Sequence, residues 1–173
     1  MDEKERDPRE VRVYEELDRL GIPYTRMDHE PAFDMKSCAA IDRALGAPIC
    51  KNLFLCNRQR TKYYLLLMPG DKPFKTKELS AQIGSSRLSF GSPEDMRRLL
   101  GTDPGAASVM GLMNDTAGEV SLLADEDVLK EEYLGCHPCV NTSSLKLRTR
   151  DVFEVFVPAE GHRVTPVCLT GED

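Results

Sequence analysis

The amino-acid sequence predicts an α/β (or α+β) protein with a mixed β-sheet surrounded by helices. Three observations predict this class: apolar runs of strand length, segments in which apolar residues recur at helical spacing, and Gly or Pro at the boundaries between them. The chain has 173 residues, of which 40% are hydrophobic, and this is enough for one domain with a core. We expect a single domain over residues 8–170, after a disordered lead at 1–7.

The first elements are two helices with a short strand between them. Pro8 is typical of a helix start and Gly21 of a helix end, and the apolar residues between them recur at helical spacing. The strand, at 22–28, has Pro23 near its start, which is tolerated only at the edge of a sheet. The second helix is predicted at 37–45 and is again followed by glycine.

A hairpin and a third helix come next. Two apolar runs, 52–56 and 63–68, flank the polar turn 57–60. Because these runs do not alternate with polar residues, they fit strands that are covered on both faces. A helix follows at 75–83, and Gly84 ends it.

The fourth helix has the clearest start in the chain. Ser92 is a preferred N-cap, proline follows it at the first helical position, and Gly101 offers the end. After a loop, we expect the segment 108–113 to turn at Asn114 and Asp115 so that a strand at 119–123 pairs back on it.

The last third of the chain is expected to contain two helices and two strands. A short helix is predicted at 125–133, and residues 143–147 alternate in the manner of a strand. Thr149 would cap a helix that ends before Pro158, and a final strand is expected at 163–169.

The charge balance limits the kind of partner. The chain carries 23 basic and 29 acidic residues, a net charge of −6, which argues against a protein that coats long nucleic acid. It leaves room for contact with one short nucleic-acid end. No apolar stretch approaches 18 residues and the N-terminus lacks a signal region, so we expect a cytoplasmic protein whose cysteines are thiols.

The motif Cys136-His137-Pro138-Cys139 has several interpretations. A CxxC pair can be a redox site or half of a zinc site. No second pair lies at ligand spacing, and the motif does not open a helix after an early strand, so buried thiols are favoured and no metal is expected. His137 lies in an irregular segment, where a cleft role and a structural hydrogen-bonding role are about equally indicated.

Two further candidates carry charge or backbone donors. Lys51 begins the first strand of the hairpin, where it is either a solvated lysine or a cation for a carboxylate, phosphate or ester carbonyl. The loop at 104–108 contains Gly105 and small neighbours, so its amide N–H groups could face an oxyanion. Basic residues near the hairpin turn, among them Arg58 and Lys62, are either solvated surface or a small rim for phosphates.

Four segments, in their order and spacing, resemble one known family. The resemblance, which runs from about Val11 to Leu169, is to the YbaK/prolyl-tRNA synthetase-associated editing family, and specifically to its freestanding alanyl-tRNA(Pro) deacylase branch. The matching segments are His29-Glu30-Pro31-Ala32-Phe33, Lys51-Asn52-Leu53-Phe54-Leu55, Pro104-Gly105-Ala106-Ala107-Ser108 with Gly111-Leu112-Met113-Asn114-Asp115, and His137-Pro138-Cys139-Val140-Asn141-Thr142.

This resemblance implies a mixed central sheet around one pocket and hydrolysis of the ester between a wrongly attached amino acid and the terminal adenosine of tRNA. It places the catalytic roles on Lys51, Gly105 and His137. It implies no cofactor, and as partners a mischarged tRNA, presumed to be that for proline, with transient contact to prolyl-tRNA synthetase. The substrate-binding residues would be Phe33, Asn52, Ala106, Ser108 and Val109, the last standing where many relatives have proline.

The mechanism that we expect uses water directly, because an aminoacyl ester is already activated. Backbone N–H groups near Gly105 would stabilise the oxyanion, Lys51 would hold the phosphate or the amino-acid end by its charge, and His137 would position the substrate or the water. A small pocket would accept alanine and refuse proline. The alternatives are a deacylase for cysteinyl, seryl or threonyl esters, a non-catalytic module that binds tRNA ends or a partner, and a thiol redox protein.

Overall fold

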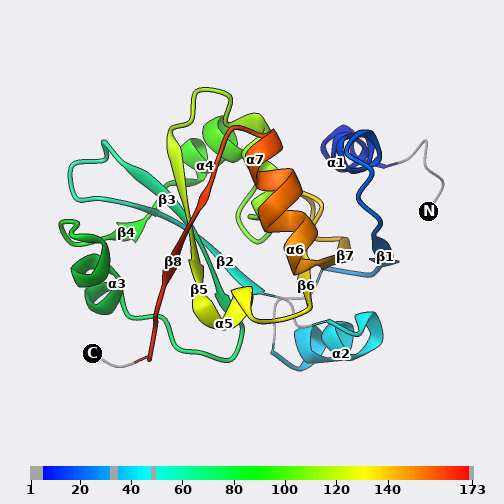
Figure 1. Cartoon of the computed structure of the whole chain (residues 1–173), viewed down its shortest axis with the longest axis horizontal. Helices are drawn as coiled ribbons and strands as arrows, with labels where there is room; N and C mark the ends of the chain where they lie inside the picture. The colour runs from blue at the N-terminus through cyan, green and yellow to red at the C-terminus, as the bar shows by residue number, and fades with distance from the viewer. Residues whose placement is uncertain (1–5, 32–34, 48–49, 172–173) are drawn as a thin grey trace.

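The computed structural model describes the backbone of residues 6–31, 35–47 and 50–171, with the side chains in these ranges except those of 35–39. Strands in this part of the chain form two sheets (Figure 1). The smaller is antiparallel, in the order β1 (Thr25–Asp28), β7 (Ser143–Arg148), β6 (Tyr133–Cys136). The larger has the order β4 (Ser89–Phe90), β2 (Cys50–Cys56), β3 (Tyr63–Pro69), β5 (Val120–Asp125), β8 (Val164–Val167).

The larger sheet is mixed, which confirms the predicted class. Strands β2 and β3 form the predicted antiparallel hairpin, whereas β3 with β5 and β5 with β8 are parallel. Both faces are covered, as the unbroken apolar runs indicated: Leu65 and Leu67 belong to one buried cluster, and Leu66 and Met68 to the other. Each such fully buried side chain stabilises the fold by roughly 1.5–3 kcal/mol relative to an exposed one.

Several helices begin and end where local sequence signals indicate. The Asp7 carboxylate caps the first helix through the backbone N–H of Arg9, and Ser92 caps the fourth in the same way. Gly84 and Gly101 end two helices at a φ of +68°, which favours glycine. The helices are α1 (Pro8–Arg19), α2 (Met35–Leu45), α3 (Thr76–Ile83), α4 (Pro93–Leu100), α5 (Glu126–Leu129), α6 (Thr149–Asp151) and α7 (Val157–Ala159). Among the described residues no helix has the length and apolarity needed to cross a membrane.

The expected pairing of 119–123 with 108–113 is wrong. Residues Val109–Asn114 form the 3₁₀ helix η2, and β5 pairs with β3 and β8 instead. Two side chains explain the short helix, because the Ser108 hydroxyl accepts the N–H of Met110 and the Asn114 amide donates to the carbonyl of Leu100.

Two helix ends also differ from expectation. The helix predicted at 125–133 stops at Leu129, since Tyr133 already begins β6 and pairs with Arg148. The C-terminal helical segment does not end before Pro158. The π turn η3 (Val152–Phe156) leads into α7, which contains Pro158. A proline has no N–H to donate within a helix, and here the π turn directly precedes it.

The start of the chain reaches the smaller sheet. Residues 1–5 of the expected lead lie outside the described residues, whereas Arg6 is buried and forms ion pairs with Glu10 and Asp28. The Ser143 hydroxyl lies 3.0 Å from the Glu10 carboxylate and 2.6 Å from that of Asp28. This cluster connects α1 with β1, through Asp28, and with β7, through Ser143.

Candidate active site

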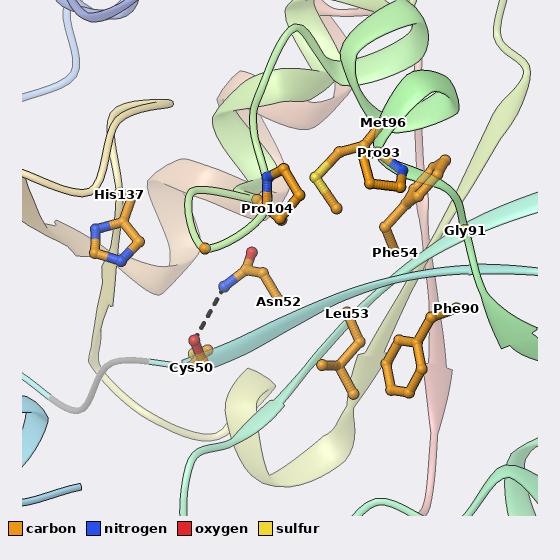
Figure 2. Close-up of a pocket in the computed structure, with 12 residues that line it drawn as sticks. Cys50, Asn52, Leu53, Phe54, Phe90, Gly91, Pro93, Met96, Pro104 and His137 are labelled. Carbon is orange, nitrogen blue, oxygen red and sulfur yellow. Dashed lines mark hydrogen bonds between the residues drawn. The ribbon is translucent and has the colours of Figure 1, made fainter. Parts of the chain in front are cut away.

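The site is a cavity of about 390 Å³ between β2, the loop 102–107 and the segment that follows β6. Figure 2 shows His137 at one end, Asn52 in the middle, and Leu53, Phe54 and Phe90 toward the other end. One end is therefore polar and the other apolar. The lining residues are Cys50, Asn52, Leu53, Phe54, Phe90, Gly91, Pro93, Met96, Pro104, Gly105, Ala107 and His137.

The floor of the cavity is an open strand edge. Strand β4 is only two residues long and pairs with Leu55 and Cys56, so the earlier part of β2 has no strand beside it on that side. Gly91 donates its N–H to the carbonyl of Phe54 at 2.9 Å, which shows that the backbone groups of Phe54 point toward this edge. Because backbone groups two residues apart point the same way, the N–H and C=O of Asn52 also face the cavity.

The side chain of Asn52 fastens the neighbouring loop to this strand. Its Oδ1 accepts the backbone N–H of Val109 at 3.1 Å, and its Nδ2 donates to the carbonyl of Cys50 at 3.0 Å. The chain has valine where many members of the resembled family have proline, and proline has no N–H to donate. Val109 itself is fully buried, so its contribution to the site is this backbone hydrogen bond.

The loop 102–107 brings to the cavity two residues whose backbone donors are unused. Gly105 has a φ of +90°, a conformation that favours glycine, and both Gly105 and Ala107 line the cavity. Within the part of the chain that the structure describes, their N–H groups have no acceptor. The loop is held from outside, because the carboxylate of Asp103 pairs with Arg9 at 3.0 Å and with Arg97 at 2.7 Å.

His137 is oriented as a neutral hydrogen-bond acceptor. Its Nδ1 lies 2.9 Å from the carbonyl of Ser143, and since a carbonyl only accepts, Nδ1 carries the proton and Nε2 has a free lone pair. Burial lowers the pKa of His137 below its ordinary value, and the nearby His29 ring, 6.3 Å away between ring centres, lowers it further. His137 is therefore neutral at pH 7.

His29 lies next to His137 and was not predicted as a site residue, although it begins one of the matching segments. Its Nδ1 donates to the carbonyl of Glu30, and its Nε2 lies 2.8 Å from the hydroxyl of Ser144, from which it accepts. Both side-chain nitrogens are thus occupied. The sequence did point to this residue, because His29 is the first residue of the matching segment 29–33.

The structure brings only some of the predicted residues to the cavity. Gly105, His137 and Asn52 line it, whereas Lys51, Ala106, Ser108 and Val109 do not, and Phe33 lies outside the described residues. Ala106 is buried and lines a separate cavity of about 380 Å³ behind the loop.

Lys51 leaves β2 on the face opposite to Asn52, because neighbouring side chains of a strand point to opposite faces. Its ammonium donates to the backbone carbonyl of Lys72 at 2.5 Å. Leu53 comes from this same face and still lines the cavity, which therefore extends around the open edge of β2. Lys51 thus lies one strand position from the cavity, with its ammonium bound to a neutral carbonyl.

The cysteines near the site are poor nucleophiles. Cys50, Cys136 and Cys139 are free and buried, and burial raises the pKa of Cys50 and of Cys139 to about 12 and that of Cys136 further still. Only a thiolate attacks an ester or a disulfide, so these thiols are inert near neutral pH. No group of potential metal ligands is found among the described side chains.

Taken together, the cavity is lined by two residues with unpaired amide N–H groups, a neutral imidazole and an exposed strand edge. This set can stabilise an oxyanion and orient a water molecule, and it contains no activated nucleophilic side chain. Hydrolysis of an already labile ester is the chemistry that such a set supports.

Comparisons with known proteins identify the family of this chain. A family model described as the aminoacyl-tRNA editing domain matches residues 29–155. The prolyl-tRNA editing protein ProX of Acetoanaerobium sticklandii is 32% identical over 157 residues, which cover 91% of this chain and 95% of that protein. The mouse prolyl-tRNA synthetase associated domain-containing protein 1 is 28% identical, with 88% and 90% covered.

The fold is shared with a solved structure. A candidate trans-editing enzyme for prolyl tRNA synthetase superimposes with a TM-score of 0.66 at 18% identity, covering 95% of this chain and 99% of that one. Since the family model spans most of the chain and includes the strand edge, the glycine loop and the histidine of the cavity, this protein belongs to the aminoacyl-tRNA editing domain family.

Proposed function

We propose that this editing domain acts in trans on mischarged alanyl-tRNA(Pro) and releases alanine. Membership of the editing family supplies the reaction class, hydrolysis of an aminoacyl-tRNA ester. A relative named for prolyl-tRNA editing, matched along nearly its whole length, supports the tRNA for proline as the nucleic-acid partner. The protein would act in the cytoplasm, where it would meet tRNA released by prolyl-tRNA synthetase.

The observation that carries the proposal is the position of Gly105 and His137 on one cavity above the open edge of β2. A carbonyl oxygen held by the N–H groups of Gly105 and Ala107 would have its carbon exposed to a water on the side of His137. The neutral Nε2 of His137 accepts a hydrogen bond from that water and so orients it.

The chemical step is a direct hydrolysis. The water oxygen forms a bond to the ester carbon, the negative charge on the carbonyl oxygen is stabilised by the loop amides, and the bond to the ribose oxygen then breaks. One proton of the water goes to the ribose oxygen as it leaves and the other is released to solvent, so the amino acid leaves as a carboxylate. Removal of one such donor costs about 3–4 kcal/mol of transition-state stabilisation in other enzymes.

The open edge of β2 supplies the contact for the amino group of the substrate. The α-ammonium of an aminoacyl ester has three N–H donors, and the carbonyl of Asn52 faces the cavity as an acceptor. We expect the part of the cavity beside the glycine loop to hold a methyl group and to exclude the proline ring, which is how an editing site spares the correct product.

Lys51 would contribute charge rather than a covalent step. Its ammonium is bound to a carbonyl and forms no ion pair within the described residues, so its positive charge is available to a phosphate of the acceptor end. Because the Lys51 stem is long and flexible, its ammonium can leave the carbonyl of Lys72 when a phosphate approaches.

A panel of charged tRNAs tests this proposal. Purified protein is incubated with alanyl-, cysteinyl-, seryl-, threonyl- and prolyl-tRNA(Pro), and the ester that remains is measured over time. We expect the alanyl ester to be hydrolysed fastest and the prolyl ester to remain. Faster hydrolysis of another ester would show that a different amino acid is edited. No hydrolysis of any of the esters would indicate a tRNA-binding module without catalytic activity.

A further inference from the structure

The apolar end of the cavity carries an unusually exposed aromatic side chain. Phe90 has 62% of its surface exposed and lines the cavity; the other large apolar side chain exposed in the described part of the chain is Val155, at 37%. Because ligand pockets are lined mainly by apolar and aromatic side chains with a few polar groups, a phenyl ring exposed in the wall of this cavity is placed to contact a ligand.

The ring of Phe90 is held in place by its backbone and by one neighbour. Phe90 pairs with Leu55 across β4 and β2, and a Cβ added to Gly91 would lie 2.2 Å from the ring of Phe54, so this segment packs closely on β2. The ring of Phe74 contacts Phe90 edge to face, with 6.1 Å between ring centres. Phe90 is thus positioned before any ligand arrives.

We propose that Phe90, supported by Phe74, is the stacking platform for the unpaired terminal base of the tRNA acceptor end. This inference rests on the proposed function, because an ester bound at Gly105 and His137 has its ribose and base attached on the leaving-group side. The same cavity continues from that polar end to Phe90 (Figure 2). Aromatic side chains stack on any base, since every base has a π-face.

Two basic residues belong to β2, which forms the floor of the cavity, and to the turn that follows it. Lys51 is two residues from Leu53 on the same face of β2, and Leu53 and Phe74 pack against the same buried cluster. The backbone N–H of Arg58 donates to the hydroxyl of Ser86, which brings the turn after β2 beside the segment that leads to β4. In a chain of net charge −6, such local cations make binding of a short, unpaired nucleic-acid end feasible.

The absence of tryptophan from the sequence provides a direct probe. The variant Phe90→Trp carries one indole at the platform, and Val155→Trp carries one on η3, away from the cavity. Each is titrated with the trinucleotide CCA. We expect saturable quenching of the indole fluorescence in Phe90→Trp and none in Val155→Trp. Equal behaviour of the two variants would overturn the proposal.

Kinetics with mischarged alanyl-tRNA(Pro) give the second measurement. We expect Phe90→Ala to lower kcat/KM about tenfold or more, the effect of losing one stacked base, and Phe90→Trp to retain it. Val155→Ala is the matched control and should leave kcat/KM unchanged. Full activity of Phe90→Ala would contradict the platform. A wild-type dimer that Phe90→Ala converts to a monomer would also contradict it, because a second copy of the chain would then cover Phe90.

The two proposals fail in different ways. If the wild-type protein hydrolyses no mischarged tRNA while Phe90→Trp is quenched by CCA, the base site stands and the proposed function is wrong. If the wild-type protein hydrolyses alanyl-tRNA(Pro) and Phe90→Trp shows no quenching, the function stands and the platform is wrong.

Discussion

At the residue scale, the backbone N–H of Val109 decides how the glycine loop is attached to β2. It is the group that Asn52 Oδ1 accepts, so the residue type at this position controls whether the hydrogen bond exists. A proline at this position has no N–H and could not make this contact. The side chain of Val109 is buried and contributes packing only.

Replacing Val109 by proline tests this attachment. Val109→Pro removes the N–H and leaves the Asn52 oxygen without its partner, which should destabilise the protein by about 1–3 kcal/mol and lower kcat/KM. Val109→Ala is the control, because it shortens the side chain and keeps the N–H. Thermal unfolding and deacylation rates are compared for both. Equal activities of the two variants would show that the hydrogen bond does not position the loop.

The neutral state of His137 predicts a pH dependence. Its folded-state pKa lies below the ordinary value of 6.5, so the acceptor Nε2 is present at neutral pH and is lost as the pH falls through that lowered pKa. We expect kcat/KM to be constant from pH 7 upward across this titration and to fall with an inflection below 6.5. His137→Gln should lack this acidic inflection. An inflection above pH 6.5, or an unchanged one in His137→Gln, would exclude this role.

At the element scale, the site depends on one short strand and one loop. Because β4 is only two residues long, β2 keeps an open edge, and the loop 102–107 can lie beside that edge. Ion pairs from Asp103 to Arg9 on α1 and to Arg97 on α4 hold the loop from two sides. These ion pairs therefore hold the loop in position beside the open edge of β2.

The variant Asp103→Asn tests this support. It removes the charge that Arg97 and Arg9 bind, so the loop amides should be less well ordered and kcat/KM should fall severalfold, with little change in Tm because these pairs are largely exposed. Raising the salt concentration should reduce wild-type activity toward that of the variant. Wild-type activity of Asp103→Asn at low salt would show that the loop is held without these pairs.

Local sequence signals predicted most of the helices and strands, whereas elements and pairings without such a signal were missed. Caps such as Ser92 and breakers such as Gly84 act within a few residues, so the sequence shows them directly. The parallel partners of β5 lie far along the chain, and β6 and the 3₁₀ helix η2 depend on contacts with neighbouring segments that no short motif announces. For the same reason the sequence indicated the polar end of the cavity, through its motifs, but not the apolar end around Phe90.

At the scale of the whole molecule, the start of the chain reaches the site through a buried charge cluster. The side chains of Arg6 and Glu10 are each only 2% exposed, and Ser143, which contacts Glu10 and Asp28, also supplies the carbonyl that orients His137. The hydrogen bond from Arg6, and then that from Ser143, hold the pKa of Asp28 below its ordinary range. Its contribution to stability is therefore present above pH 3.8 and is lost at lower pH.

Removing Arg6 leaves the buried Glu10 carboxylate without its cation. We expect Arg6→Ala to destabilise the fold by about 3 kcal/mol, measured by urea unfolding, whereas the exposed Arg150→Ala should change stability little. If Arg6→Ala unfolded at the wild-type urea concentration, the cluster would not support the fold.

Hydrolysis by a positioned water, with the amides of the glycine loop as oxyanion donors, is the central claim. The most direct test is the single-turnover rate of alanine release from alanyl-tRNA(Pro) by the wild-type protein and by Gly105→Ala, whose φ of +90° an alanine adopts only with strain. We predict a fall of at least roughly tenfold in rate, with the far-UV circular dichroism unchanged. A rate equal to that of the wild-type protein would contradict the claim.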